Sequence, residues 1–278
     1  MRRRRRVFEA TLFAATVLAL TFLLLPLVAI FLRVPLGELV TQLWSDVAVD
    51  ALVVTLETNA IAQALILLVG TPTAYFIASR RFRGRALAIT LIELPLVLPP
   101  AVAGLALLAA FGRLGLLGST FAVLGVTVST GTKAAVVLAV AYVSSPFYIR
   151  GAIASFEALD QPLLDASRTL GAGPARTFVR IALPLAARGL GAAAALSFAR
   201  GIGEFGATIM FAGSLQGVTQ TLSLAIYAQF DLDTDVALAL GALLVVVCAT
   251  ILFTVKLLPA WTRSSSTSVY PFAPSGSS

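Results

Sequence analysis

The chain has 278 residues, of which 59% are hydrophobic and only 12% are charged. An ordinary soluble domain has about 25% charged residues, so this composition predicts a membrane protein. Histidine is absent and Cys248 is the only cysteine. This excludes a disulfide framework and a cysteine-based metal site, and it removes most hydrolytic chemistry. We therefore expect no metal site and no catalytic centre.

Six apolar runs are each long enough, at about 20 residues, to cross a hydrocarbon core. In chain order they are 9–32, 51–78, 86–111, 134–154, 187–212 and 236–260. Each run must be helical, because lipid offers no partner for backbone amides and carbonyls. Proline removes a helix hydrogen bond, so kinks are expected at Pro26, Pro72, Pro95, Pro99, Pro100 and Pro146. The sequence predicts an all-α polytopic membrane protein with six transmembrane helices.

The positions of the charges predict the orientation. Sixteen of the 20 Lys and Arg fall on one side of the six runs, within 2–6, 80–85, 150–188 and 256–263. The positive-inside rule makes this side cytoplasmic and places both termini there. These cations therefore set the orientation of the chain in the membrane. We expect membrane lipid, not nucleic acid, as their partner. The acids on the other side are Glu38, Asp46, Asp50, Asp231, Asp233 and Asp235.

The two ends of the chain are interpreted separately from the spans. The start, RRRRRVF, has the arginine-rich character of a secretory signal, but the apolar run after it is too long and lacks an A-x-A site. Residues 1–262 are therefore assigned to one transmembrane domain. The Ser- and Pro-rich residues 263–278 predict a disordered cytoplasmic tail.

The longest cytoplasmic connection, about 155–186, has the pattern of two short helices joined by a turn. Asp160 is suited to the N-cap and Gly171 to a left-handed position that ends the first helix. The second helix is expected to begin at Pro174 and to stop near Pro184. One apolar face at helical spacing is predicted from Leu163, Ala166, Ser167 and Leu170. Periodicity alone slightly favours a helix pair lying on lipid headgroups.

The spacing inside this connection adds a second interpretation. Residues 165–184 read DASRTLGAGPARTFVRIALP. This resembles the EAA loop of permease subunits of ATP-binding-cassette (ABC) importers, E-A-A, three residues, G, nine residues, I-x-L-P. Asp165 replaces the usual Glu and Ser167 the usual Ala. The stretches 93–118 and 199–227 resemble the molybdate and tungstate branch of that family, with sulfate permeases as close relatives.

This resemblance implies a MetI-like ABC importer permease fold and a non-catalytic transport subunit in the plasma membrane of a prokaryote. It implies a second permease copy, two ABC ATPase subunits and an extracytoplasmic oxyanion-binding protein as partners. ATP and magnesium would be held by the ATPase, with no cofactor in this chain. The residues implied to contact the ATPase are Leu164, Asp165, Ala166, Ser167, Leu170 and Gly171.

A second set of residues makes sense as part of a pore or gate. The candidates are Pro95, Pro99, Pro100, Gly203, Glu204, Phe205, Gly206 and Thr208. Glu204 is a costly acid within an apolar run, and Arg200 is its expected ion-pair partner on the same helix. Whether Glu204 gates or only stabilises is left open. The hydroxyl of Thr208, amides near the glycines and the proline-interrupted backbone of 95–100 are the expected contacts for a dianion.

Two alternatives to a molybdate or tungstate permease remain at this point. The first is a sulfate or thiosulfate ABC permease, which the same stretches resemble. The second is an ion-coupled secondary transporter, which would have inverted repeats and several buried acids. We find no convincing repeat, and intramembrane acids are few.

Overall fold

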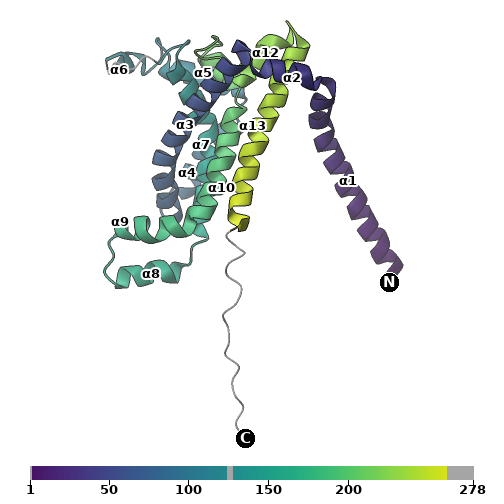
Figure 1. The fold of residues 1–278 in the computed structure, drawn as a ribbon. Coiled ribbons are helices and arrows are strands. Elements are labelled where there is room, and N and C mark those ends of the chain that lie inside the picture. The colour runs from purple at the N-terminus through teal and green to yellow at the C-terminus, as the bar shows by residue number, and fades with distance from the viewer. Residues whose placement is uncertain (1, 124–127, 262–278) are drawn as a thin grey trace.

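The computed structural model describes residues 2–123 and 128–261, and this part of the chain is all-helical (Figure 1). Five helices are long and apolar enough to cross a membrane. They are α1 (Arg2–Arg33), α3 (Asp46–Ser79), α7 (Lys133–Glu157), the helix Pro174–Ile202 and α13 (Thr234–Trp261). A sixth span is obtained when α4 (Arg85–Val97) and α5 (Pro100–Phe111) are counted as one bent pair. The prediction of six spans is met in this sense.

The centre of the bundle is formed by α3, α7 and α10 (Leu183–Ile202). Small side chains allow these helices to approach closely, and hydrogen bonds join them. Asn59 Nδ2 of α3 donates to the carbonyl of Phe198 in α10 at 3.1 Å. Ser197 Oγ donates to the carbonyl of Ser144 in α7 at 2.9 Å. A Cβ on Gly201 would lie 2.4 Å from Asn59 Oδ1, so this position requires glycine.

The first span lies apart from this centre. Its most apolar window, within Phe8–Arg33, has none of its residues buried, and Figure 1 shows α1 diverging from the bundle. Three short helices at the end of the bundle opposite residues 155–186 were not predicted from the sequence (Figure 1). They are α2 (Leu36–Leu43), α6 (Gly118–Val123) and α12 (Leu222–Phe230).

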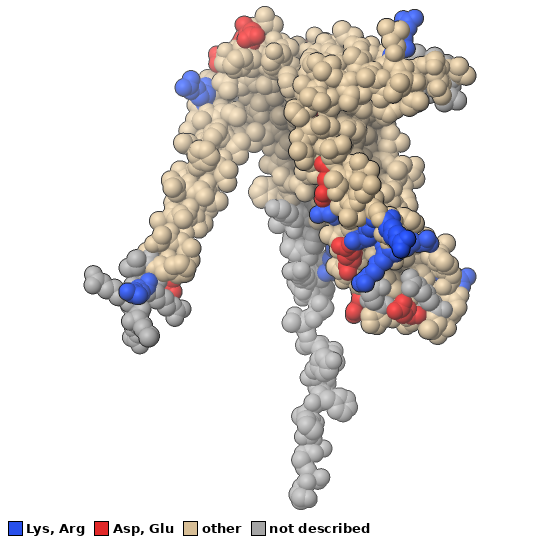
Figure 2. Space-filling view, turned by 180° about the vertical axis from the view of Figure 1, so that it is seen from behind, with Lys and Arg blue, Asp and Glu red and all other residues tan. Residues whose placement is uncertain are grey.

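Both ends of the described chain lie at one end of the bundle. The start of α1 and the end of α13 are on the same side as α8 (Gln161–Thr169) and α9 (Pro174–Thr177), as Figure 1 shows. Lys and Arg side chains gather around that end, over the α8–α9 loop and at the tip of α1 (Figure 2). The segregation of cations predicted from the sequence is therefore present in three dimensions. The predicted tail, 263–278, lies outside the described residues.

Two predicted boundaries in the second half of the chain are wrong. The second loop helix does not stop near Pro184, because hydrogen-bonded helix continues from α9 through the π-helical segment η1 (Phe178–Ala182) into α10. Leu183 N–H bonds to the carbonyl of Phe178, and this wider turn accommodates the proline that follows. Figure 1 shows the chain changing direction here, from α9 lying across the end of the bundle to α10 running along it. The fifth run, predicted as 187–212, ends as a continuous helix at Ile202.

Candidate functional site

The third apolar run is broken in its middle by two consecutive prolines. α4 ends at Val97, Leu98 and Pro99 are extended, and α5 begins at Pro100 with its axis bent by 113°. Neither proline has an N–H to continue the helix, and each disfavours helical geometry in the residue before it. The predicted kink is thus a complete change of direction.

The fifth run is broken by different chemistry. Gly203 ends α10, Glu204 and Phe205 are non-helical, and α11 (Gly206–Phe211) begins after them. Glu204 is 2% exposed and its Oε1 accepts the backbone N–H of Ala207 at 2.8 Å. The carboxylate therefore satisfies an amide of the first turn of α11, which would otherwise have no intrahelical partner.

The other oxygen of Glu204 makes the predicted ion pair. Arg200 Nη2 lies 2.7 Å from Glu204 Oε2, with 30% of the arginine side chain and 1% of the glutamate side chain exposed. A second ion pair joins α7 to α4, because Arg150 Nε lies 2.7 Å from Glu93 Oε1. Glu204 and Glu93 are thus each neutralised by an arginine, as expected for charges within apolar helices.

The two broken helices meet at the point of breakage. A Cβ on Gly206 would lie 2.4 Å from the Cβ of Pro100. A Cβ on Gly104 of α5 would lie 2.7 Å from the carbonyl oxygen of Ala207 in α11. Glycine at both positions allows α5 and α11 to pack against each other with their backbones nearly in contact.

A cavity of about 120 Å³ lies beside this junction. It is lined by Pro95, Leu96, Leu98, Pro100, Ala103, Val143, Phe147 and Arg200. Among the pore candidates only Pro95 and Pro100 line it. Arg200, which the sequence suggested only as a partner for Glu204, lines it as well.

The remaining pore candidates lie outside this cavity. Phe205 packs on Tyr227, with ring centroids 5.0 Å apart. Thr208 is fully buried, and its hydroxyl has no hydrogen-bond partner among the described residues. The proline-interrupted backbone does not suit the predicted anion contact, because proline leaves carbonyl acceptors without donors and contributes no N–H. At the break, Leu98 N–H is already bonded to the carbonyl of Leu94.

The predicted coupling loop is a compact helical unit. α8 begins directly after Asp160, and Gly171 has φ +83°, the left-handed conformation predicted from the sequence. Ser167 Oγ donates to the carbonyl of Leu164 at 2.7 Å and lies 3.1 Å from Thr177 Oγ1 of α9. This hydroxyl pair fastens α8 to the helix that continues into the bundle.

The apolar face predicted for α8 is wrong by about one residue of rotation. Leu164 and Ser167 are the buried members, whereas Leu163 is 51% and Leu170 is 88% exposed. The buried face is determined by α9 and η1, which the helical periodicity of α8 alone does not include. Of the residues implied to contact an ATPase, Asp165, Ala166, Leu170 and Gly171 are exposed within this chain.

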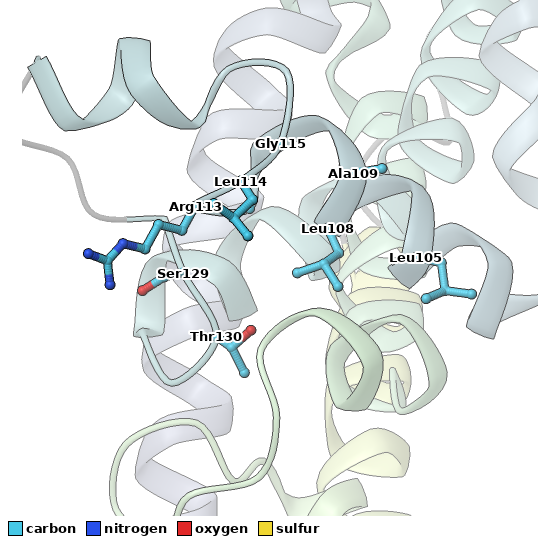
Figure 3. A pocket seen from close by; sticks show the side chains of 9 residues that line it. Leu105, Leu108, Ala109, Arg113, Leu114, Gly115, Ser129 and Thr130 are labelled. Carbon is cyan, nitrogen blue, oxygen red and sulfur yellow. The ribbon is translucent and has the colours of Figure 1, made fainter.

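A larger pocket at the opposite end of the bundle was not predicted. It has a volume of about 700 Å³ and is lined mainly by the end of α5 and the loop after it, together with Ser129 and Thr130 (Figure 3). In Figure 3 the guanidinium of Arg113 extends away from the side chains of Leu105 and Leu108. The pocket is therefore mostly apolar and wide.

The fold and these sites together define a component of a membrane transport system: a helical bundle with two interrupted spans at its centre and a helical loop projecting from one end. A profile of the family described as "Binding-protein-dependent transport system inner membrane component" matches residues 70–263. This chain belongs to that family.

Named relatives cover most of the chain. The "Molybdenum transport system permease protein ModB" of Mycobacterium tuberculosis (strain ATCC 25618 / H37Rv) is 43% identical over 230 residues, which are 83% of this chain and 87% of the relative. The "Probable transport system permease protein NifC" of Clostridium pasteurianum is 31% identical over 253 residues, 91% of this chain and 88% of the relative.

Solved structures share the architecture. A chain of a bacterial alginate ABC transporter, in complex with a pentasaccharide-bound periplasmic protein, aligns with a TM-score of 0.74 at 18% identity and covers 96% of this chain and 98% of its own length. A chain of the MetNI methionine ABC transporter aligns with a TM-score of 0.61 at 18% identity, covering 77% and 95%. At this identity the likeness concerns the fold, and it confirms the predicted MetI-like permease fold.

Proposed function

We propose that this chain is the membrane permease subunit of an ATP-driven importer for molybdate or tungstate. The substrate is supported by relatives named as molybdenum permeases at 43% and 38% identity. We assign the end that carries α8 and α9 to the cytoplasm, because the Lys and Arg gather there (Figure 2). Both termini are then cytoplasmic, and the chain is a multi-pass protein of a prokaryotic plasma membrane.

The observation that carries the coupling mechanism is that α8 projects from the bundle and is fastened to α9, which continues through η1 into α10 without a break in the helix. An exposed short helix can dock into a groove of a separate ATPase subunit. When two ATPase subunits close on MgATP, the docked helix moves with them and carries α10 along. One chain supplies one such helix, so the assembly we propose has two permease copies and two ATPase subunits.

Energetics favours an ATP-driven mechanism over passive entry. Bringing a dianion into an interior at negative potential costs about 4.6 kcal/mol per 100 mV, which is twice the roughly 2.3 kcal/mol per charge. ATP hydrolysed by the partner subunits supplies this work, and an external binding protein delivers the oxyanion to the other face.

The test is reconstitution of the chain with its ATPase subunits and binding protein in lipid vesicles, followed by measurement of ATP hydrolysis and uptake with molybdate, tungstate and sulfate. We expect molybdate and tungstate to stimulate both. Stimulation by sulfate alone would assign the chain to sulfate transport. Uptake driven by an ion gradient without ATP would contradict the proposal.

A further inference from the structure

We infer that Arg200 is the permease's own contact for the oxyanion in transit, and that Glu204 is a positioning residue that holds the guanidinium in place. This inference rests on the proposed function and assigns a binding group to it. The observation behind it is a cation that faces a cavity between the two helix breaks.

The cavity lies at the depth where a charge is hardest to place. Two of its lining residues, Val143 and Phe147, are on α7, which crosses the bundle from Lys133 to Glu157. Val143 is ten residues from one end of α7 and Phe147 is ten residues from the other. At a rise of 1.5 Å per residue, each lies about 15 Å from the nearer end of the helix. A cation at this depth must be paired or must face a polar space.

Arg200 is paired and also lines the cavity. One side of its guanidinium is paired with Glu204 at 2.7 Å, and 30% of its side chain remains exposed. A guanidinium carries five N–H donors, of which a carboxylate takes at most two in a bidentate pair. The other donors are available to a second acceptor, and planar N–H pairs suit the oxygens of an oxyanion.

The rest of the cavity offers no competing donor. Its other lining residues are Pro95, Leu96, Leu98, Pro100, Ala103, Val143 and Phe147, none of which has a polar side chain. Apolar side chains beside a cation lower the local dielectric and strengthen its attraction for an anion. With a volume of about 120 Å³, the cavity has room for a small anion.

Glu204 explains how such a contact would be kept weak. Its carboxylate is 1% exposed, accepts the N–H of Ala207 and faces Arg200 with its other oxygen. It is therefore shielded from the cavity by the arginine it holds, and it reduces the net positive charge that a dianion meets. Conduction requires a site that attracts an ion without trapping it, so an arginine paired with a carboxylate suits transit better than a lone one.

Movement of α10 relative to α4 and α5 would change the shape of the cavity. Pro95 and Pro100 lie on either side of the α4–α5 break, and Arg200 lies just before the α10–α11 break. The breaks touch through Gly206 and Pro100. Displacement of α10 by the coupling loop would shift Arg200 relative to the prolines that form the opposite wall.

The experiment uses the reconstituted complex with its ATPase and binding protein, and it measures uptake of labelled molybdate per ATP hydrolysed. Arg200→Gln is expected to lower this ratio by about tenfold or more, the loss expected for one charge-assisted hydrogen bond. Arg200→Lys retains the charge but not the planar guanidinium. We expect its uptake per ATP to lie between that of the wild type and that of Arg200→Gln. Glu204→Gln leaves an unneutralised cation and is expected to slow release, lowering the maximal rate and the half-saturating concentration together.

The double variant Arg200→Gln with Glu204→Gln separates a transport contact from a structural ion pair. If the pair only stabilises the fold, neutralising both partners removes the uncompensated charge and restores uptake. If Arg200 binds the oxyanion, uptake stays low although assembly and ATP hydrolysis recover. A double variant within about twofold of the wild-type ratio would overturn the inference.

A matched control is the exposed pair Lys133–Glu57, which joins α7 to α3 at 2.6 Å and does not line the cavity. Lys133→Gln with Glu57→Gln should leave uptake per ATP unchanged. Failure of the wild-type complex to move any oxyanion would defeat the proposed function itself. Normal transport by both the wild type and Arg200→Gln would defeat only the role of Arg200.

Discussion

The end of the bundle that carries α8 and α9 and the middle of the bundle respond differently to proline. At the α8–α9 end, Pro184 lies in continuous hydrogen-bonded helix, because the π-helical turn before it supplies the extra width. In the middle, the tandem Pro99 and Pro100 separate α4 from α5 by a bend of 113°. A helix can continue past one proline when a wider turn precedes it. Two consecutive prolines lack two N–H donors in succession, and the helix ends there.

A second contrast follows from the break that contains no proline. α10 ends at Ile202 because Gly203 follows and Glu204 turns its carboxylate onto the first turn of the next helix. The middle of the bundle therefore has two helix breaks, while the α8–α9 end has a loop fixed to a continuous helix. A displacement of α8 can therefore be transmitted through α9 and α10, and the chain can bend at the α4–α5 and α10–α11 breaks.

The largest effect on uptake is expected from a substitution on α8. Asp165→Arg reverses the charge of an exposed position on α8 and should abolish uptake while the protein remains folded in the membrane. Charge reversal in a docking surface places like charges together or leaves one unpaired. Uptake assays combined with co-purification of the ATPase subunits provide the measurement.

Asp165→Asn is the matched variant, since it keeps the shape and removes only the charge. An intermediate loss of uptake is expected for it. Normal transport by Asp165→Arg with its own ATPase would show that α8 is not the docking helix.

A smaller effect is expected from a substitution at the two helix breaks in the middle of the bundle. Gly206→Val places a side chain where even a Cβ would lie 2.4 Å from Pro100, so the two breaks can no longer touch. Overpacking of this kind costs about 1–3 kcal/mol. We expect a lower melting temperature of the purified complex and a loss of uptake with little change in ATPase binding.

Gly191→Ala is the control for that experiment. It adds a methyl group within α10 where nothing lies within 4 Å, so the melting temperature should hold or rise slightly. An unchanged melting temperature for Gly206→Val would mean that α11 does not pack on α5 as described.

The sequence predicted the spans, the loop and the Arg200–Glu204 ion pair, because hydropathy, charge and spacing are local signals. It did not predict the end of α10 at Ile202, since hydropathy averaged over a long window conceals a short interruption at 203–205. The clustering of Gly201, Gly203 and Gly206 around an Arg–Glu pair is the signal that could have indicated a break. The role of Arg200 in the cavity requires α4, α5 and α7 to come together in space, which no single segment encodes.

The smallest effect is expected at the junction between α8 and α9. Ser167→Ala removes a hydroxyl that lies 3.1 Å from Thr177 Oγ1, and Thr177 is 1% exposed. Loss of one hydrogen bond costs about 0.5–1.5 kcal/mol, so amides of α8 should exchange faster with deuterium while uptake changes little.

The double variant Ser167→Ala with Thr177→Val decides whether this pair fastens the loop. Replacing both hydroxyls by apolar groups of similar shape avoids leaving a buried donor unsatisfied, so exchange should return toward the wild-type rate. If Ser167→Ala alone leaves the exchange of α8 unchanged, the burial of Leu164 is what holds α8 on α9. The α8–α9 end of the bundle would then be held by packing of apolar side chains, as the middle is held where Gly206 meets Pro100.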